Sequence, residues 1–250
     1  MSQPIAQPDR DHRVSLAPIS RTLFLRRLDE LIALHLKAMG YPPEAFRQRR
    51  SLWLSNANHP HFTSLVALLH SPQEEPDPSN PAQKIVGVCF GFQGSRGTWW
   101  YQQVSYGLLA AGMPPEEVTE TLANYTEISE IHVLPHFQGS GIGTRLLTEV
   151  LGILPTRDAM LSTPEVPGEN NHAWHLYRSL GFTDLLREHH FPGDPRPFGI
   201  LRKRLHNPQV SPTTVPEPAS GEDRAADWPH EPFGISPACD CPTPTGRPRW

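Results

Sequence analysis

The sequence predicts an α/β fold with a mixed central sheet, and three observations lead to that class. Segments with helical periodicity alternate with strand-like apolar runs through the middle of the chain, between residues 84 and 182. Paired strand-like runs that can form hairpins stand at both ends of that region, at 61–94 and 183–205. Pro-rich polar segments lie outside these limits. The alternating pattern therefore belongs to one folded unit.

The chain has 250 residues, and its 29 prolines are unevenly spread. Residues 206–250 are rich in Pro, Ser, Thr and Asp and hold hardly an aliphatic side chain. Such a segment cannot bury enough apolar surface to offset the entropy of ordering it. We expect a disordered N-terminus at 1–12, a folded domain at 13–205 and a disordered Pro-rich tail at 206–250.

Charge and composition exclude several classes of protein. The net charge of −4 and the lack of a Lys/Arg stripe argue against a nucleic-acid surface. No apolar run has the length of a bilayer span, and the N-terminus lacks a signal pattern. Cys89 lies in an apolar run, and Cys239 and Cys241 lack the second pair of ligands that a zinc site needs. We expect a cytoplasmic, reduced protein without a metal, a nucleic-acid partner or a membrane.

The first half of the chain reads as strand, helix, helix and hairpin. Leu28, Ile32 and Leu36 recur at helical spacing, and Gly40 marks the end of that helix. The next helix begins with prolines and places Phe46 on the same side as a leucine. The expected segments, in order, are a strand at 13–20, helices at 21–40 and 42–58, and antiparallel strands at 61–71 and 84–94.

The second half reads as alternating elements that end in a strand pair. Two short helices are expected between 97 and 125, broken at 112–115 by Gly and Pro. A strand at 126–135, a helix at 141–154, a strand at 158–163 and a helix at 169–182 follow. Gly181 suits the C-terminal end of that last helix. The strands at 183–191 and 197–205 complete the pattern.

Three glycines, Gly139, Gly141 and Gly143, stand between a strand and a helix. The dinucleotide fingerprint would need a further glycine at Thr144 or Leu146, and the lysine of a P-loop is missing. The N–H groups that open a helix still form an anion site when no side chain blocks them. A flexible turn without a ligand is the alternative interpretation.

Residues 138–143 read Q-x-x-G-x-G and resemble the acetyl-CoA loop of the GNAT family of N-acetyltransferases. The preceding "EIHVLP" is similar to the family's fourth strand. The later "ENNHAWHLYRSLGF" is similar to a family helix written N-x-x-A-x-x-L-Y-x-x-x-G-F. That pattern falls here on Asn170, Ala173, Leu176, Tyr177, Gly181 and Phe182.

The resemblance covers residues 127–182 closely. It implies a mostly antiparallel sheet with splayed central strands, and it makes 13–205 an acetyltransferase domain. The segments Trp99–Trp100 and Phe191–Asp194 resemble an actinobacterial branch of the family.

The family's cofactor is acetyl-CoA, and the resemblance implies which residues contact it. Loop N–H groups cradle the pyrophosphate, with Gln138 at the entrance. In the family a bulge splays the fourth strand, and N–H groups there meet the acetyl oxygen. Asn170 matches a cofactor-contacting residue, or it only caps its helix. The full set is His132, Val133, Leu134, Gln138, Gly139, Ser140, Gly141, Ile142, Gly143, Thr144 and Asn170.

Acetyl transfer to an amine also needs an acid and a base. Tyr177 matches the family's general acid, and a core aromatic is the alternative. An amine with a pKa near 10 must lose a proton before it attacks. Strict alternation puts Glu127 and Glu130 on opposite faces of their strand, with Glu130 beside His132. We expect Glu130 to be the base, ahead of Glu127, with His132 as the outside candidate.

The sequence leaves the acceptor open. No Lys or Arg lies between Arg96 and Arg145. Five acids lie there and could attract a cationic amine: Glu116, Glu117, Glu120, Glu127 and Glu130. A solvated helix face plus one buried strand acid is the plain alternative. A small-molecule amine, a protein lysine and a protein N-terminus all fit, and so do a monomer and a homodimer. The alternative function is a non-catalytic CoA-binding sensor or adaptor with a partner-binding tail.

Overall fold

The computed structural model describes residues 12–205, and the expected terminal segments lie outside this range except for His12. One seven-stranded sheet runs through it in the order β1-β2-β3-β4-β5-β7-β6. All neighbouring strands are antiparallel except β4 and β5, which are parallel. The strands are β1 (Arg13–Pro18), β2 (Thr63–His70), β3 (Lys84–Gln93), β4 (Tyr125–Val133), β5 (Asp158–Pro164), β6 (Thr183–His190) and β7 (Pro197–Arg204).

The helices occupy the expected segments. They are α1 (Arg21–Arg26), α2 (Leu28–Met39), α3 (Phe46–Asn56), α4 (Trp99–Ala110), α5 (Pro115–Thr121), α6 (Ile142–Ile153) and α7 (His172–Ser179). Single 3-10 turns η1 (Pro43–Ala45), η2 (Pro135–Phe137) and η3 (Pro167–Glu169) precede α3, α6 and α7. None of the helices within 12–205 is long and apolar enough to cross a membrane.

One sequence expectation about the first helices is wrong in detail. The helix expected at 21–40 is interrupted at Arg27, whose guanidinium donates hydrogen bonds to the Pro78 and Gln83 carbonyls of the β2–β3 connection. In α3, Phe46 and Leu52 both pack against the core while partly buried, and Trp53 is fully buried.

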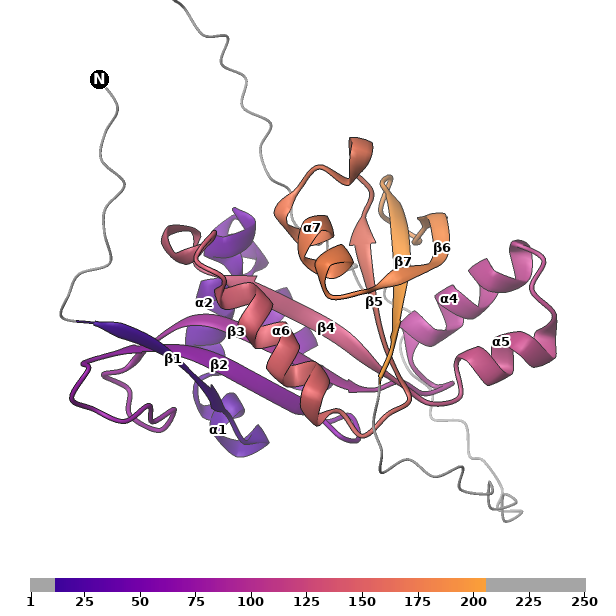
Figure 1. Cartoon of the computed structure of the whole chain (residues 1–250). Coiled ribbons are helices and arrows are strands. Elements are labelled where there is room, and N and C mark those ends of the chain that lie inside the picture. Colours follow the sequence, from indigo (N-terminus) through magenta and orange to yellow (C-terminus); the bar gives the residue numbers. More distant parts are fainter. Residues whose placement is uncertain (1–11, 206–250) are drawn as a thin grey trace, which may run out of the picture.

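Helices cover both faces of the sheet (Figure 1). Helix α6 packs on one face of β2, β3 and β4. A Cβ built at Gly87 would lie only 3.1 Å from a methyl carbon of Leu146, so the glycine allows this close packing. Helices α2 and α3 pack on the other face, where His35 and Trp53 meet side chains of β4. Strand β4 is therefore sandwiched between α6 and the α2–α3 pair.

The apolar interior forms two clusters. The larger joins β1–β4 with α1–α3 and α6, and contains the buried Cys89, a core residue as expected. The smaller lies under α4 and α5, where Trp100, Tyr101 and Val104 pack against β5 and β7. Trp100 also donates a hydrogen bond to the Ser162 hydroxyl at 3.3 Å. The aromatic segment 99–101 thus packs mainly as the core of the second half of the sheet.

Strand β4 carries a bulge that changes the direction of its side chains. Phe90 on β3 pairs with Glu130, and Phe92, on the same face of β3, pairs with Glu127. Two residues along β3 therefore match three along β4, and Ser129 is the extra residue. The expectation that Glu127 and Glu130 lie on opposite faces is wrong, because the bulge interrupts the alternation on which it rested. Both carboxylates lie on the face covered by α2 and α3.

Strands β4 and β5 separate soon after they meet (Figure 1). Their pairing joins Tyr125 to Asp158, Thr126 to Ala159 and Glu127 to Met160 and goes no further in the described chain. Beyond this point β5 pairs with β7 along its other edge. The splayed central strands expected from the sequence are confirmed. Within residues 12–205, the β4 edge from Ile128 to Val133 has no neighbouring strand on the β5 side.

Candidate active site

The glycine loop forms an open helix N-terminus. Gly139 and Gly141 have φ angles of 75° and 80°, in the left-handed region that glycine tolerates best. A Cβ built on either would meet no atom within 4 Å. Gly141 is the N-cap of α6, and no side chain caps that helix. The N–H groups of its first turn therefore point into open space with the positive end of the helix dipole behind them.

Two side chains hold this loop to its own backbone. Gln138 Nε2 donates to the Val133 carbonyl at 3.0 Å, and the Ser140 hydroxyl donates to the Phe137 carbonyl at 2.5 Å. Both bonds fix the turn between β4 and α6. The geometry fits an anion such as a pyrophosphate, because bare backbone donors converge and no Cβ fills the space.

The free edge of β4 determines which expected N–H donors face the opening. Leu134 N donates to the Val86 carbonyl of β3 at 2.9 Å, so the Leu134 N–H expected at the acetyl group is already paired and faces away from the opening. Since successive residues point their N–H groups to alternate edges, His132 N–H also faces β3. Val133 N–H and Ile131 N–H face the gap beside β5. Ile131 was not expected from the sequence, because the edge of β4 that its N–H faces depends on the hydrogen-bond pattern between β3 and β4.

Glu127 ends the β4–β5 pairing and faces the α2–α3 side. Its Oε2 is buried and has no hydrogen-bond partner among residues 12–205. Burial, with a smaller contribution from the nearby Glu130 carboxylate, raises the pKa of Glu127 to about 8. A carboxyl group with an unpaired oxygen and a near-neutral pKa can take a proton from an amine.

Glu130 is held on both oxygens, unlike Glu127. Trp53 Nε1–H donates to Oε1 at 3.1 Å, and His132 Nε2 lies 2.6 Å from Oε2. Glu130 and His132 are 5% and 7% exposed. Glu130 is the base expected first from the sequence, yet both of its oxygens are already engaged within the core.

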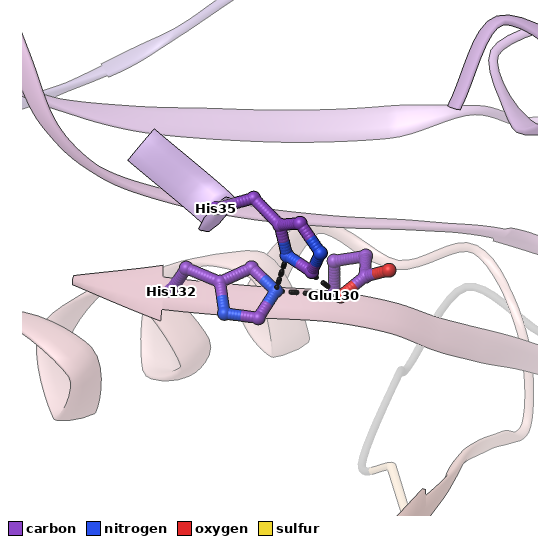
Figure 2. Close-up of side chains that lie close together, drawn as sticks. All are labelled: His35, Glu130 and His132. Carbon is purple, nitrogen blue, oxygen red and sulfur yellow. Dashed lines mark hydrogen bonds and ion pairs between the residues drawn. The ribbon is translucent and has the colours of Figure 1, made fainter. Parts of the chain in front are cut away.

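His35 completes a cluster that the sequence analysis did not predict (Figure 2). Its Nδ1 lies 2.9 Å from His132 Nε2 and 3.9 Å from Glu130 Oε2. Burial lowers the pKa of His35 to about 3, although Glu130 opposes the shift. The sequence indicates His35 only by its position. It continues the apolar face of α2, three residues after Ile32, where an apolar side chain is expected.

The residues of the later helix take different places. Tyr177 is 5% exposed, belongs to the main core and packs edge-on against the Phe182 ring at 5.9 Å. Asn170 is exposed and precedes the helix. The N-cap of α7 is Asn171, whose side chain accepts from Trp174 N at 2.8 Å. Helix capping is thus excluded for Asn170, since its neighbour does it.

The acids expected to attract an amine are divided between two places. Glu116, Glu117 and Glu120 are exposed on α5, which lies at the far end of the sheet from α2 (Figure 1). The two β4 carboxylates are the acids that line the α2–α3 side. The acidic stretch thus consists of a solvated helix face and two strand acids, where the plain alternative expected one.

Comparison with known proteins places this geometry in a family. The acetyltransferase (GNAT) family matches residues 72–182. A GCN5-like protein acetyltransferase of Mycobacterium tuberculosis is 35% identical over 190 residues, which are 72% of this chain and 92% of that protein. The mycobacterial source agrees with the actinobacterial resemblance of the sequence.

Solved structures give weaker matches. The protein yncA of Salmonella typhimurium, solved with acetyl-CoA, is 13% identical with a TM-score of 0.48, over 81% of this chain and 99% of that one. NAA60 of Arabidopsis thaliana in complex with acetyl-CoA is 17% identical with a TM-score of 0.46, over 78% and 100%.

The match over most of the mycobacterial enzyme carries the assignment. This chain belongs to the GNAT family of acetyltransferases, and acetyl-CoA is its acyl donor.

Proposed function

We propose that the protein transfers the acetyl group to a primary amine of another protein, a lysine side chain or an N-terminus, by direct attack on the thioester. The observation that carries the transfer site is the free edge of β4, which runs into the uncapped N-terminus of α6. The protein acceptor is supported by the name of the mycobacterial relative, a protein acetyltransferase. The reaction needs no metal.

The residues for the cofactor lie along one continuous path. The N–H groups from Ser140 to Thr144 would hold the pyrophosphate, and Val133 N–H and Ile131 N–H would bind along the free edge of β4. Acetyl-CoA supplies the thioester carbon that the amine attacks. A preorganised N–H donor aimed at the developing oxyanion contributes about 3 kcal/mol in comparable sites.

Glu127 is the base in this proposal. It takes one proton from the incoming ammonium, so that the nitrogen lone pair can form the new C–N bond while the C–S bond breaks. Three features of Glu127 support the choice: its Oε2 without a hydrogen-bond partner among the described residues, its raised pKa and its place where β4 and β5 part. Tyr177 remains the proposed proton donor to the departing thiolate, and Asn170 a proposed cofactor contact.

A thiol-release assay tests the proposal. Acetyl-CoA is incubated with the full chain and, in separate reactions, a lysine peptide, a peptide with a free N-terminus, spermidine and an aminoglycoside. Thiol release with a peptide and not with the small amines is the expected result. Release only with small amines would overturn the protein acceptor. Cofactor binding without release from any amine would favour the sensor or adaptor.

A further inference from the structure

Three ligand atoms converge in the interior between α2 and β4 (Figure 2). His132 Nε2 lies 2.6 Å from Glu130 Oε2 and 2.9 Å from His35 Nδ1, and the last two atoms are 3.9 Å apart. The three side chains are 6%, 4% and 1% exposed. Buried polar groups in such numbers need partners for every lone pair.

Hydrogen bonds alone satisfy this cluster poorly. A proton on His132 Nε2 can point at Glu130 or at His35, and one N–H serves two acceptors badly. Moving the proton to His35 Nδ1 leaves the His132 lone pair facing the Glu130 carboxylate. In either form His35 Nε2 is buried without a partner among the described residues.

We propose that His35, Glu130 and His132 form a Zn²⁺ site. Two imidazole nitrogens and one carboxylate oxygen suit zinc, whereas Mg²⁺ and Ca²⁺ prefer oxygen ligands. Ligands at about 2.1 Å in a tetrahedron lie about 3.4 Å apart, and each separation in the cluster is within about 0.8 Å of that value. The ion takes the place of the proton between these atoms: each imidazole keeps its single N–H on the ring nitrogen that does not bind the ion, and the three lone pairs that face one another bind the ion.

The surroundings of Glu130 support this arrangement. Trp53 Nε1–H holds Oε1 at 3.1 Å and thereby orients Oε2 towards the two imidazoles. Such outer hydrogen bonds are usual around metal-binding carboxylates. The ion would tie α2 to β4, two elements that are nearly a hundred residues apart in the chain.

The site also bears on acetyl transfer, a consequence that rests on the proposed function. Glu127 lies on the same face of β4 as two of the ligands. A divalent cation beside it stabilises the charged carboxylate and makes it a weaker base. Zinc binding is therefore expected to move the pH profile of turnover to lower pH.

The experiment uses the full chain with Cys239→Ser and Cys241→Ser, because these two thiols lie outside the described residues and could bind zinc themselves. Zn²⁺ is titrated in competition with a chromophoric chelator, without acetyl-CoA. We expect one ion per chain with submicromolar affinity. His35→Gln in the same background is expected to weaken binding at least 100-fold. His175→Gln, which changes an exposed histidine on α7, leaves it unaltered.

Two results would overturn the proposal: no zinc bound at 10 µM free ion, or equal affinity in the His35→Gln chain. Circular dichroism checks that the variant is folded. If it is not, X-ray absorption on the zinc-loaded parent chain decides, and a shell with fewer than two imidazoles rejects the site. Zinc affinity is measured without an acceptor amine. A negative thiol-release assay, which would reject the proposed function, therefore does not change the zinc-binding result.

Discussion

The two sides of strand β4 differ in how the chain builds them. On the cofactor side, the loop of residues 138–144 and the helix that follows are one contiguous segment. On the opposite face, Glu127, Glu130 and His132 meet His35 from α2 and Trp53 from α3. The first arrangement depends on local backbone geometry, and the second on packing between distant elements. The local anion site is therefore marked by a sequence motif, whereas no sequence motif marks the polar cluster.

The largest effect is expected from Glu127→Gln. The amide cannot accept the proton of the ammonium, so turnover should fall by about 10²–10⁴-fold while affinity for acetyl-CoA stays within a factor of two. Thiol release and calorimetric titration of acetyl-CoA measure the two quantities. Glu130→Gln is the matched control, since Glu130 is a carboxylate on the same face. If Glu130→Gln abolished turnover and Glu127→Gln did not, the assignment of the base would be reversed.

The next effect concerns the packing that builds the α2–α3 side. Trp53→Phe keeps a ring but removes the donor to the Glu130 carboxylate, and should cost about 1.5–3 kcal/mol of unfolding free energy. Trp174→Phe is the control, because this equally buried indole donates at 2.9 Å to the neutral Pro164 carbonyl. Its hydrogen bond should contribute about 1 kcal/mol. Urea denaturation measures both, and equal losses would contradict the special role of Trp53.

On the cofactor side, Gly141→Ala tests the local geometry. A side chain at a φ of 80° is strained, and its methyl group enters the space open to the pyrophosphate. The KM for acetyl-CoA should rise about tenfold, equivalent to about 1.4 kcal/mol, with little change in kcat. Gly152→Ala lies in the same helix with no neighbouring atom within 4 Å and should leave KM unchanged. A raised KM in both variants would show that the effect comes from a change in helix α6 and not from filling the proposed pyrophosphate site.

The smallest effect is a shift of the pH profile. The carboxyl of Glu127 must be ionised to act, so kcat/KM should rise with pH around the pKa of about 8. Glu130→Gln removes a neighbouring charge that raises this pKa, and the midpoint should move to lower pH. An unchanged midpoint in Glu130→Gln would show that the two carboxylates do not interact.

The same carboxyl makes folding stability depend on pH. Its folded pKa lies above the ordinary 4.5, so the native state holds the proton longer than the unfolded chain does. The stabilisation is fully present below 4.5 and is lost as the pH rises to about 8. The loss approaches about 1.4 kcal/mol per pH unit, and Glu127→Gln should abolish it. Chemical denaturation at several pH values measures the difference between the two proteins.

Most of the fold follows from residues that act locally. Gly40 and Gly181 have φ angles of 65° and 80° beyond the ends of α2 and α7, as expected for helix termini. The apolar runs of β2 and β3 pair as an antiparallel hairpin. The break at Arg27 was not predictable from spacing, because it accompanies hydrogen bonds to carbonyls more than fifty residues away.

The sequence by itself determined the α/β class, the order of the elements, the glycine cradle and the acetyl-CoA family. These features depend on residues close together in the chain, where backbone dihedrals and periodicity leave few choices. Only the tertiary structure decided which carboxylate is paired on both oxygens and which has a buried oxygen without a partner among the described residues. One extra residue at Ser129 turned Glu127 to the face of Glu130, and the packing of α2 and α3 brought His35 and Trp53 to that face. Strand register and helix packing are set by contacts across the whole sheet, which no local pattern encodes.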